Sequence, residues 1–560
     1  MTGKICAASA LLAGLWVGCA QAALVISTAA TSNVSCSGGV CTATAANAVL
    51  NAHDLMVSLA HGDMTLVSGS TAQDIEFDTP VHWTSAHRLT LDSYHAITFT
   101  QPVISEGTGG ITMTTNDGGT GGDIYFTGKG RVALWDLGSA LTINGKPYTL
   151  VNNVAGLAAA VSANPAGRIA FANIYNASVD GVYSQSPVAI DFDGTFEGLG
   201  NTISHLTVDG GRGLFSSLGP SSTQAILRDI VLSGTVIRAP SGKAGALVAW
   251  NYGTVIGASS IGGMVSVASG DLMSAGGLVG RLDFSGGRFG TVIRSFSSTR
   301  VVCGNFCAAS GLVGSSEEGR IRQSGASGAV AAGNHANAGG LLGENDGSSS
   351  SVALSFATGS VTVRNAFDGA NTNVIATAGG LVGHNAGMID QSYATGTVSG
   401  GSGLKYATNH VWVGGLVGLG DYDGSATRSL ITHSYARGAV SVGAQGDAGG
   451  FAGKSPSRYT TQCYSTGAVS TSGASEIGGF VGYDTWVGGY ASAHDYWDLD
   501  TSGVSDPGKG AGNTTNDQGI TGLTTAQLQS GLPSGFDPTI WAESAGINNG
   551  LPYLLDIPPQ

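Results

Sequence analysis

The apolar positions of this chain fall in short runs of four or five residues, and Gly, Asn, Asp and Ser bound these runs. Runs of this length between turn-forming residues are typical of β-strands. In the second half of the chain the runs carry a recurring Gly-Gly-apolar-apolar-Gly signature. It begins at Gly276, Gly339, Gly379, Gly414, Gly449 and Gly478, with variants at Ala244 and Ser310. Such a repeat predicts stacked supersecondary units.

A second element follows the copies of the signature, and its fullest form is Ser-aromatic-Ala-Thr-Gly-x-Val. It begins at Ser295, Ser324, Ser355, Ser392 and Ser434. Cys463 takes the Ser position in the last copy, so we expect a small residue of the solenoid wall there rather than a catalytic thiol. Three Asn residues follow the signature at one common offset, which predicts stacked Asn side chains at one corner: Asn251, Asn345 and Asn385.

Each unit is too small to bury its own apolar face, so only stacking can supply a continuous core. Glycine provides the positive φ angles of tight corners and lets neighbouring backbones approach closely. We therefore predict an all-β fold, a parallel β-helix that is right-handed by the crossover rule. It would form one elongated solenoid, roughly 75 to 100 Å long. A propeller is the main alternative, but its blades need four antiparallel strands in about 40 to 45 residues.

The segments outside the repeats carry other strand patterns. Residues 83–100 alternate between apolar and polar positions, and the strings GGDIYFTGKGRVALWDL and ALTINGKPYTL continue in that style. The stretch that starts at Val154 is the one that favours a helix, of about two turns. The expected organisation is a signal peptide (1–22), an N-terminal solenoid region (23–150), transition coils (151–235), the repeats (236–485) and a C-terminal capping region (486–560).

Composition supports this interpretation and excludes one class of partner. Glycine accounts for 91 of 560 residues, and charged residues are only 11% of the chain, against about a quarter in ordinary globular domains. The hydrophobic content of 42% argues against a disordered linker. The net charge of −14 argues against nucleic acid, because phosphates need a basic surface.

The N-terminus has the pattern of a secretory signal. Lys4 gives a positive start, residues 5–17 form an apolar segment too short to span a membrane, and Ala20-Gln21-Ala22 is a small-x-small cleavage site. The mature chain is expected to begin at Ala23. A lipoprotein signal with Cys19 as the lipidated residue is the alternative, although Trp16 stands where such signals have Leu.

The other cysteines suit an oxidising compartment. Cys36 and Cys41 bracket four residues, and Cys303 and Cys307 bracket three. Such short loops favour two local disulfides, which would leave Cys463 free. Free thiols are one alternative. A metal site is the other, but it would need further His or Cys beside these pairs, and the sequence has none there.

Acidic clusters are the candidates for chemistry, because glycosidic hydrolysis needs two carboxylates across the sugar. They are Asp191 with Asp193, Asp421 with Asp423, Glu317 with Glu318, and Asp495 with Asp498 and Asp500. Most of these lie in turn-forming strings, where Asp is a normal residue. The D-x-D-G turns could bind Ca²⁺, but none extends to a full loop of oxygen ligands. We expect no catalytic, cofactor-binding or metal residues and no enzymatic activity.

The residues resemble a known group of proteins. The string GGLVGHNAGMIDQSYATGTVSG resembles the GLUG repeat of large bacterial surface proteins. RLTLDSYHAITFTQPV, FDGTFEGLGNTISHLTVDG and HDYWDLDTSG followed by GLTTAQLQ are similar to filamentous-haemagglutinin-like outer-membrane and secreted proteins. The likeness covers most of residues 33–560. It implies a β-helical rod, export, and adhesion to cells or surfaces.

The chain departs from that group in one motif. Members that use two-partner secretion carry an Asn-Pro-Asn motif, and the nearest match here is Asn164-Pro165-Ala166-Gly167. The resemblance therefore supports fold and location better than a route across the outer membrane. The expected function is an exported adhesin-like rod at the cell surface or outer membrane, or secreted, which promotes cell adhesion or biofilm formation.

The expected partners are a ligand on a host cell or surface, either glycan or protein, and an outer-membrane export partner. A structural scaffold of the envelope or matrix and a carbohydrate-active β-helix enzyme are the alternatives. The enzyme is the less favoured, because repeats spread similar residues along a rod, whereas chemistry needs unlike groups that converge in one cleft.

Overall fold

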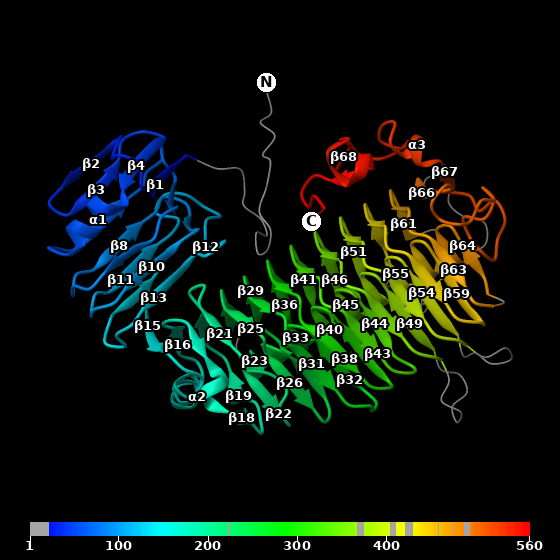
Figure 1. Ribbon diagram of the computed structural model, residues 1–560, viewed down its shortest axis with the longest axis horizontal. Coiled ribbons are helices and arrows are strands. Elements are labelled where there is room, and N and C mark those ends of the chain that lie inside the picture. The colour runs from blue at the N-terminus through cyan, green and yellow to red at the C-terminus, as the bar shows by residue number, and fades with distance from the viewer. Residues whose placement is uncertain are drawn as a thin grey trace.

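The computed structural model describes residues 22–221, 225–366, 375–403, 410–420, 429–456, 459–473, 475–486 and 493–559. Strands make up 46% of the protein and helices 6%. Nearly all strands pair in parallel with strands of the preceding and following turns of the chain, which we call coils (Figure 1). The predicted parallel β-helix is confirmed.

The N-terminal stack comprises residues 22–151 and has three sheets. The first contains β4 (Asn47–Asn51), β1 (Ala23–Ser27), β6 (Asp74–Phe77), β9 (Ile97–Phe99) and β12 (Ile124–Phe126). The second contains β7 (Val81–Trp83), β10 (Pro102–Ser105) and β13 (Arg131–Leu134). The third includes β3 (Val40–Ala43), β5 (Met64–Val67), β8 (Leu89–Asp92), β11 (Ile111–Thr114) and β14 (Leu141–Ile143). Successive coils therefore lie in register on all three faces.

Large side chains fill the interior of this stack because alternate strand positions point inward. Phe77, Phe99 and Phe126 occupy one position in three successive coils, and their ring centroids are 5.1 and 5.2 Å apart. Helix α1 (Ala52–Leu59) packs against this core through Leu55 and Leu59. Asn51 caps α1 by accepting hydrogen bonds from two backbone N–H groups.

A tight hairpin reverses the chain at the end of the N-terminal stack. Asn144 and Gly145 have φ angles of 47° and 71°, which suit a two-residue turn. The strand that follows, β15 (Lys146–Val151), pairs antiparallel with β14 and parallel with β16 (Arg168–Phe171). Leu150 of β15 belongs to the core of the N-terminal stack, whereas the adjacent Val151 belongs to a second core. The core thus changes to the other face of the sheet.

The protein is therefore two stacks with separate cores and not the single continuous solenoid that the sequence predicts. Figure 1 shows them joined at an angle, as a bent rod. The helix expected from Val154 is present as α2 (Val154–Ala163). It lies in the connection that follows the reversal. The sequence analysis missed α1 and the short α3 (Thr525–Leu528), which the structure shows in addition.

The C-terminal stack begins at Val151 and has five strands in a typical coil. One coil consists of β36 (Thr291–Ile293), β37 (Phe296–Ser297), β38 (Arg300–Cys303), β39 (Cys307–Ser310) and β40 (Val313–Glu317). Equivalent strands pair from coil to coil, so that the described residues form five long parallel sheets. The sheet that contains β37 runs from β17 (Tyr175–Asn176) to β67 (Ile520–Leu523). We call it the aromatic sheet.

The glycine signature forms the corner between the fourth and fifth strands of each coil. A Cβ atom at Gly340 would lie 2.0 Å from the carbonyl oxygen of Gly380, and one at Gly380 would lie 2.0 Å from that of Gly415. A Cβ atom at the last glycine of the signature, Gly383, would lie 2.6 Å from the carbonyl oxygen of Gly343. The repeat therefore needs glycine because the backbones of neighbouring coils touch at this corner.

The Ser positions of the second element form a buried hydrogen-bond ladder. The Oγ of Ser355 accepts from the backbone N–H of Ser324 at 3.2 Å, and the Oγ of Ser392 accepts from that of Ser355 at 3.2 Å. Cys463 continues this column and is buried and free, as predicted. Asn345 and Asn385 stack with a hydrogen bond of 2.7 Å.

The predicted Asn stack is wrong at Asn251. Two coils lie between Asn251 and Asn345, so Asn251 aligns with Leu282 of the next coil and not with another Asn. Its side chain accepts instead from the N–H of Gly253. A second ladder, which the sequence analysis missed, lies at another corner. It runs through Asn305, Asn334 and Asn365. The side-chain oxygen of each accepts a hydrogen bond from a backbone N–H of the next coil.

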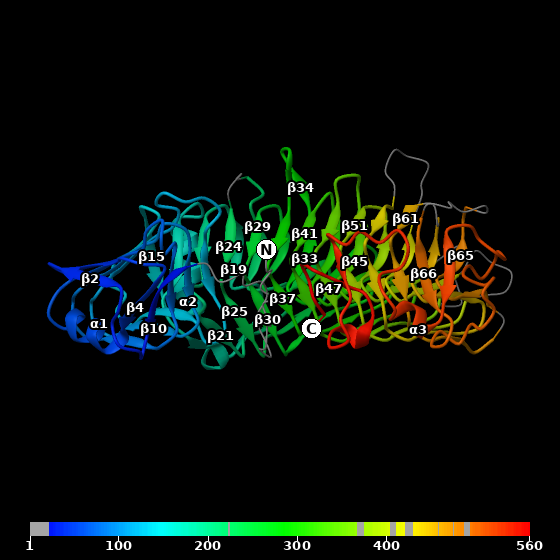
Figure 2. The same cartoon turned by 90° about the horizontal axis from the view of Figure 1, so that it is seen from above.

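The C-terminal segment folds back over the outside of the stack. After β66 (Asp495–Asp498) and β67, residues 524–557 lie along the outer face of the aromatic sheet (Figures 1 and 2). They cover a column of rings in which Phe356, Tyr393, Tyr435 and Tyr464 stack at 5.4, 4.9 and 5.1 Å between centroids. The capping region thus covers a side of the solenoid as well as its end.

Both predicted disulfides are confirmed. Cys36 bonds to Cys41 across the hairpin of β2 (Val34–Ser37) and β3, where the two residues lie directly opposite each other. Cys303 bonds to Cys307 at the turn between β38 and β39. Cys19 and the proposed signal peptide lie outside the described residues, apart from Ala22.

Candidate functional site

A groove lies where the N-terminal stack meets the outer face of the aromatic sheet. We call it the junction groove; its volume is about 360 Å³. One wall comes from residues 125–131 of the N-terminal stack. The opposite side comes from successive coils of the C-terminal stack, at Ile174, Gly200, Thr202, Asp229, Val231, Gly257, Ser259, Arg294 and Phe296. Its volume lies in the usual range for ligand pockets.

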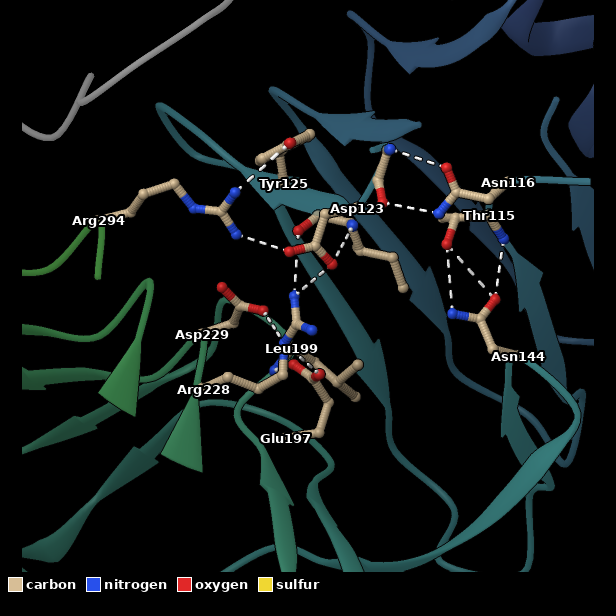
Figure 3. Close-up of polar contacts among 12 residues, drawn as sticks. Thr115, Asn116, Asp123, Tyr125, Asn144, Glu197, Leu199, Arg228, Asp229 and Arg294 are labelled. Carbon is tan, nitrogen blue, oxygen red and sulfur yellow. Dashed lines mark hydrogen bonds and ion pairs between the residues drawn. The ribbon is translucent and has the colours of Figure 1, made fainter. Parts of the chain in front are cut away.

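An ion network beside the groove holds the two stacks together (Figure 3). Arg228 of the C-terminal stack lies 2.8 Å from Asp123 of the N-terminal stack, and also 3.1 Å from Glu197 and 2.7 Å from Asp229. Asp123, the residue just before β12, is the acid of the N-terminal stack in this network, and both of its arginine partners, Arg228 and Arg294, belong to the C-terminal stack. The network therefore fixes the angle at which the stacks meet.

Arg294 extends this network into the groove. Its guanidinium lies 2.6 Å from Asp123 and 4.8 Å from the ring of Tyr125, whose hydroxyl is 3.4 Å away. Figure 3 shows Arg294 reaching across from the C-terminal stack to these two residues. An arginine placed over an aromatic ring gains a cation–π attraction, so this contact joins Tyr125 of the N-terminal stack to the C-terminal stack.

The buried carboxyl groups of the network differ in their pKa shifts. Burial acts to raise the pKa of Asp123, but the charges of Arg228 and Arg294 outweigh it and lower the pKa. Burial raises the pKa of Glu197 to about 8, although Arg228 opposes this. Burial likewise raises the pKa of Asp229. Three carboxyl groups face two guanidinium groups, so the network retains a proton near neutral pH.

Two cations on the groove wall have no such partners. Lys129 and Arg131 make no ion pair or side-chain hydrogen bond with the described residues, and the Nε of Arg131 is buried without an acceptor. A buried, unsatisfied donor is uncommon in folded proteins. Glu197 and Asp229 are almost fully buried, and the only charged residues on the wall of residues 125–131 are Lys129 and Arg131.

Glycine lets the wall of the groove approach the sheet. Gly200 has a φ of 70°, and a Cβ atom there would lie 2.6 Å from the carbonyl oxygen of Gly130 and 2.9 Å from the ring of Phe126. A backbone hydrogen bond of 2.9 Å, donated by Val132 to Leu199, joins the stacks beside this contact. The N-terminal wall of the groove thus consists of the end of β12, the turn of residues 127–130 and the start of β13, held directly against the C-terminal stack.

Several acidic clusters named in the sequence analysis lie elsewhere, in structural hydrogen bonds. Asp193 accepts from the backbone N–H of Ser221, and Glu318 accepts from that of Ser349 at 2.6 Å. Glu317 pairs with Arg281. Asp191 is exposed on β19 (Val188–Phe192).

The last acidic cluster serves two structural roles. Asp495 is buried and accepts from Thr460 and from the backbone of Cys463, in the Ser ladder. Asp498 accepts from the hydroxyl of Thr525, and Asp500 from the backbone N–H of the same residue. Both acids thereby anchor the returning C-terminal segment. Asp421 and Asp423 lie outside the described residues.

Sequence reasoning missed the junction groove entirely. The contacts that join its two sides are between residues far apart in the chain. Asp123 and Arg228 are 105 positions apart, and Asp123 and Arg294 are 171 positions apart. In the sequence, the string that contains Lys129 and Arg131 shows only a strand pattern. No local signal marks residues so far apart as neighbours.

Among the described residues, no group of three or more His, Cys, Asp and Glu side chains is placed to hold a metal ion. The helices within the described ranges include none that is both long and apolar enough to cross a membrane.

Comparison with known proteins identifies one repeat. Residues 376–399 match the family model of the GLUG motif. This match covers β49 (Ala376–Gly379) through the start of β53 (Val398–Gly400), which together include one glycine corner and one rung of the Ser ladder. No curated protein matches the chain. The motif is typical of extracellular surface proteins, and the stacked coils fit GLUG-repeat proteins of this kind.

Proposed function

We propose that this protein is exported and works as an adhesin-like rod of the filamentous-haemagglutinin kind, which attaches the cell to other cells or to surfaces. The GLUG match and the long parallel stacks support the class of protein. Its signal peptide would be removed before Ala23, and the mature rod would be displayed on the cell surface or secreted.

The observation that carries the proposal is the junction groove. It presents unpaired cations and partly exposed aromatic rings to solvent, while its carboxyl groups are buried in ion pairs. A groove of this kind suits recognition of a ligand. General acid–base chemistry needs carboxyl groups within reach of a bound substrate, and Glu197 is only 2% exposed.

Deletion of the gene tests the proposal. We expect the deletion strain to lose attachment to a surface or to cells in a washed adhesion assay, and a copy of the gene on a plasmid to restore it. N-terminal sequencing of the protein recovered from the cell surface or medium should begin at Ala23. Unchanged attachment of the deletion strain, or an intact Met1 on cytosolic protein, would contradict the proposal.

A separate measurement addresses the carbohydrate-active alternative. Purified protein is incubated with polysaccharides, and new reducing ends or unsaturated products are measured over time. We expect no release of products. Cleavage of a polysaccharide, together with normal attachment of the deletion strain, would show that the protein is a carbohydrate-active enzyme and not an adhesin.

A further inference from the structure

We infer that the junction groove binds a short acidic oligosaccharide, whose carboxylate groups pair with Lys129 and Arg131 and whose sugar rings lie against the aromatic side chains. This inference rests on the proposed binding function and names the ligand chemistry. It follows from three features of the groove: its unpaired cations, its rings and its preformed shape.

The charge of the groove favours an anion. Lys129 lies in the turn of residues 127–130, which the N–H of Gly130 closes by donating to the carbonyl of Thr127 at 2.8 Å, and Arg131 begins β13 directly after it. Both side chains line the groove. Neither has an acidic partner among the described residues, although acidic residues outnumber basic residues by 37 to 23 in the chain. A guanidinium group without a partner favours a carboxylate ligand, which matches its fork of donors.

The rings of the groove favour a sugar over a simple ion. Tyr125, Phe126 and Phe296 all line it and are all partly exposed. A sugar ring has an apolar face of C–H groups that packs on an aromatic ring, while its hydroxyl groups remain hydrogen-bonded to solvent. The groove joins rings and cations within about 360 Å³, so one oligosaccharide would contact both.

The groove exists before any ligand arrives. Asp123 links Arg228 and Arg294, and Gly200 allows direct contact between the stacks. Because ion pairs and backbone hydrogen bonds fix the wall of residues 125–131 against the C-terminal stack, binding would order few side chains, and this lowers its entropic cost. The overall charge of −14 opposes long polyanions such as nucleic acid, which leaves a short acidic ligand as the better fit.

Calorimetric titration of the purified full-length protein tests the inference. The probe is tetragalacturonate, with maltotetraose as the neutral sugar and inorganic phosphate as the simple anion. We expect binding of the tetragalacturonate, at least about tenfold weaker binding of maltotetraose, and no measurable binding of phosphate. Equal binding of the neutral sugar, or binding of phosphate alone, would overturn the inference.

Variants locate the binding site. Lys129→Ala with Arg131→Gln should weaken the binding of tetragalacturonate by about tenfold or more, which corresponds to a loss of about 1.4 kcal/mol or more for the pair. Lys129→Glu is a second test, because Lys129 is exposed and its replacement should not disturb folding. The control is Lys146→Ala with Arg364→Gln, which removes two exposed cations outside the groove.

The outcomes separate the inference from the proposed function. If the control weakens binding as much as the groove variants do, or if the groove variants bind normally, the ligand does not occupy the groove. If gene deletion abolishes attachment but the groove variants attach normally, the adhesin function is supported and the role of the junction groove in it is contradicted. The thermal midpoint of each variant shows that it is folded.

Discussion

The two stacks solve the same packing problem with different side chains. The N-terminal stack fills its interior with large residues such as Phe77, Phe99 and Trp83, each on an alternating strand. The C-terminal stack contains many alanine and valine residues in its core and closes each coil with a glycine corner and a Ser ladder. The comparison indicates that the two stacks should tolerate different substitutions. The N-terminal stack should be sensitive to loss of side-chain volume, and the C-terminal stack to added side-chain volume at its glycine corners.

The largest effect is expected from Phe99→Ala in the N-terminal stack. The ring is fully buried between Phe77 and Phe126, so its removal would leave a cavity and lower the free energy of unfolding by about 3–5 kcal/mol. Hydrogen exchange read by mass spectrometry should show faster exchange in residues 64–134 and little change beyond residue 230. Equal acceleration in both stacks would mean that they unfold as one unit.

Gly380→Ala should damage the C-terminal stack. The added Cβ atom would meet the carbonyl oxygen of Gly415 at 2.0 Å, and we expect a loss of about 3 kcal/mol. Gly62→Ala in the N-terminal stack is the matched control, because a Cβ atom there has no neighbour within 4 Å. Thermal unfolding of both variants checks this. A stable Gly380→Ala protein would show that the corner is less tightly packed than its geometry indicates.

The junction between the stacks should weaken as the pH rises. The pKa of Glu197 is raised from 4.5 to about 8 in the folded protein, mainly by burial, so the folded state binds a proton that the unfolded chain releases. The stability that this proton gives is fully present below about pH 4.5 and is lost as the pH rises through about 8. The thermal midpoint should therefore be lower at about pH 8.5 than at about pH 5.5.

Glu197→Gln provides the test of this pH dependence. The amide cannot ionise, so the difference between the two pH values should shrink. Glu106→Gln, at an exposed position, should leave it unchanged. A wild-type midpoint that rises across this range would contradict the direction of the shift.

The smallest effect is expected at one rung of the Ser ladder. In Ser392→Ala the buried N–H of Ser355 would lose its acceptor, at a cost of about 1–2 kcal/mol. Thr397→Ala, at an exposed position of the same coil, should be neutral. Chemical denaturation followed by circular dichroism measures both. If Ser392→Ala is also neutral, the ladder would only follow from the stacking and would not stabilise it.

The sequence was a good guide wherever a residue's role repeats from coil to coil. Glycine corners, Ser positions and short strand runs recur along the chain, so their pattern predicted the stacked parallel strands and the place of Cys463. The two short cysteine spacings likewise predicted the disulfides, because each closes within one turn. The Asn stack failed at Asn251, since a common offset does not place two residues in adjacent coils.

The local sequence could not reveal features that depend on how coils meet. Asn144-Gly145 is a recognisable hairpin signal, yet only the structure shows that the core changes faces after it. In the sequence, the rings of the aromatic sheet are simply one position of the repeat. Only the structure shows that they form a column and that residues 524–557 cover it.

The sequence by itself determined the repeating unit. Each strand and corner packs against the equivalent strand and corner of the adjacent coil, and these carry residues of the same type. The tertiary structure alone decided the junction groove. Asp123 meets Arg228 and Arg294, and Lys129 and Arg131 come to line one groove with Arg294, only after a chain reversal has brought two separate stacks together. Contacts of this kind depend on the angle between the stacks, which no periodic pattern in the sequence encodes.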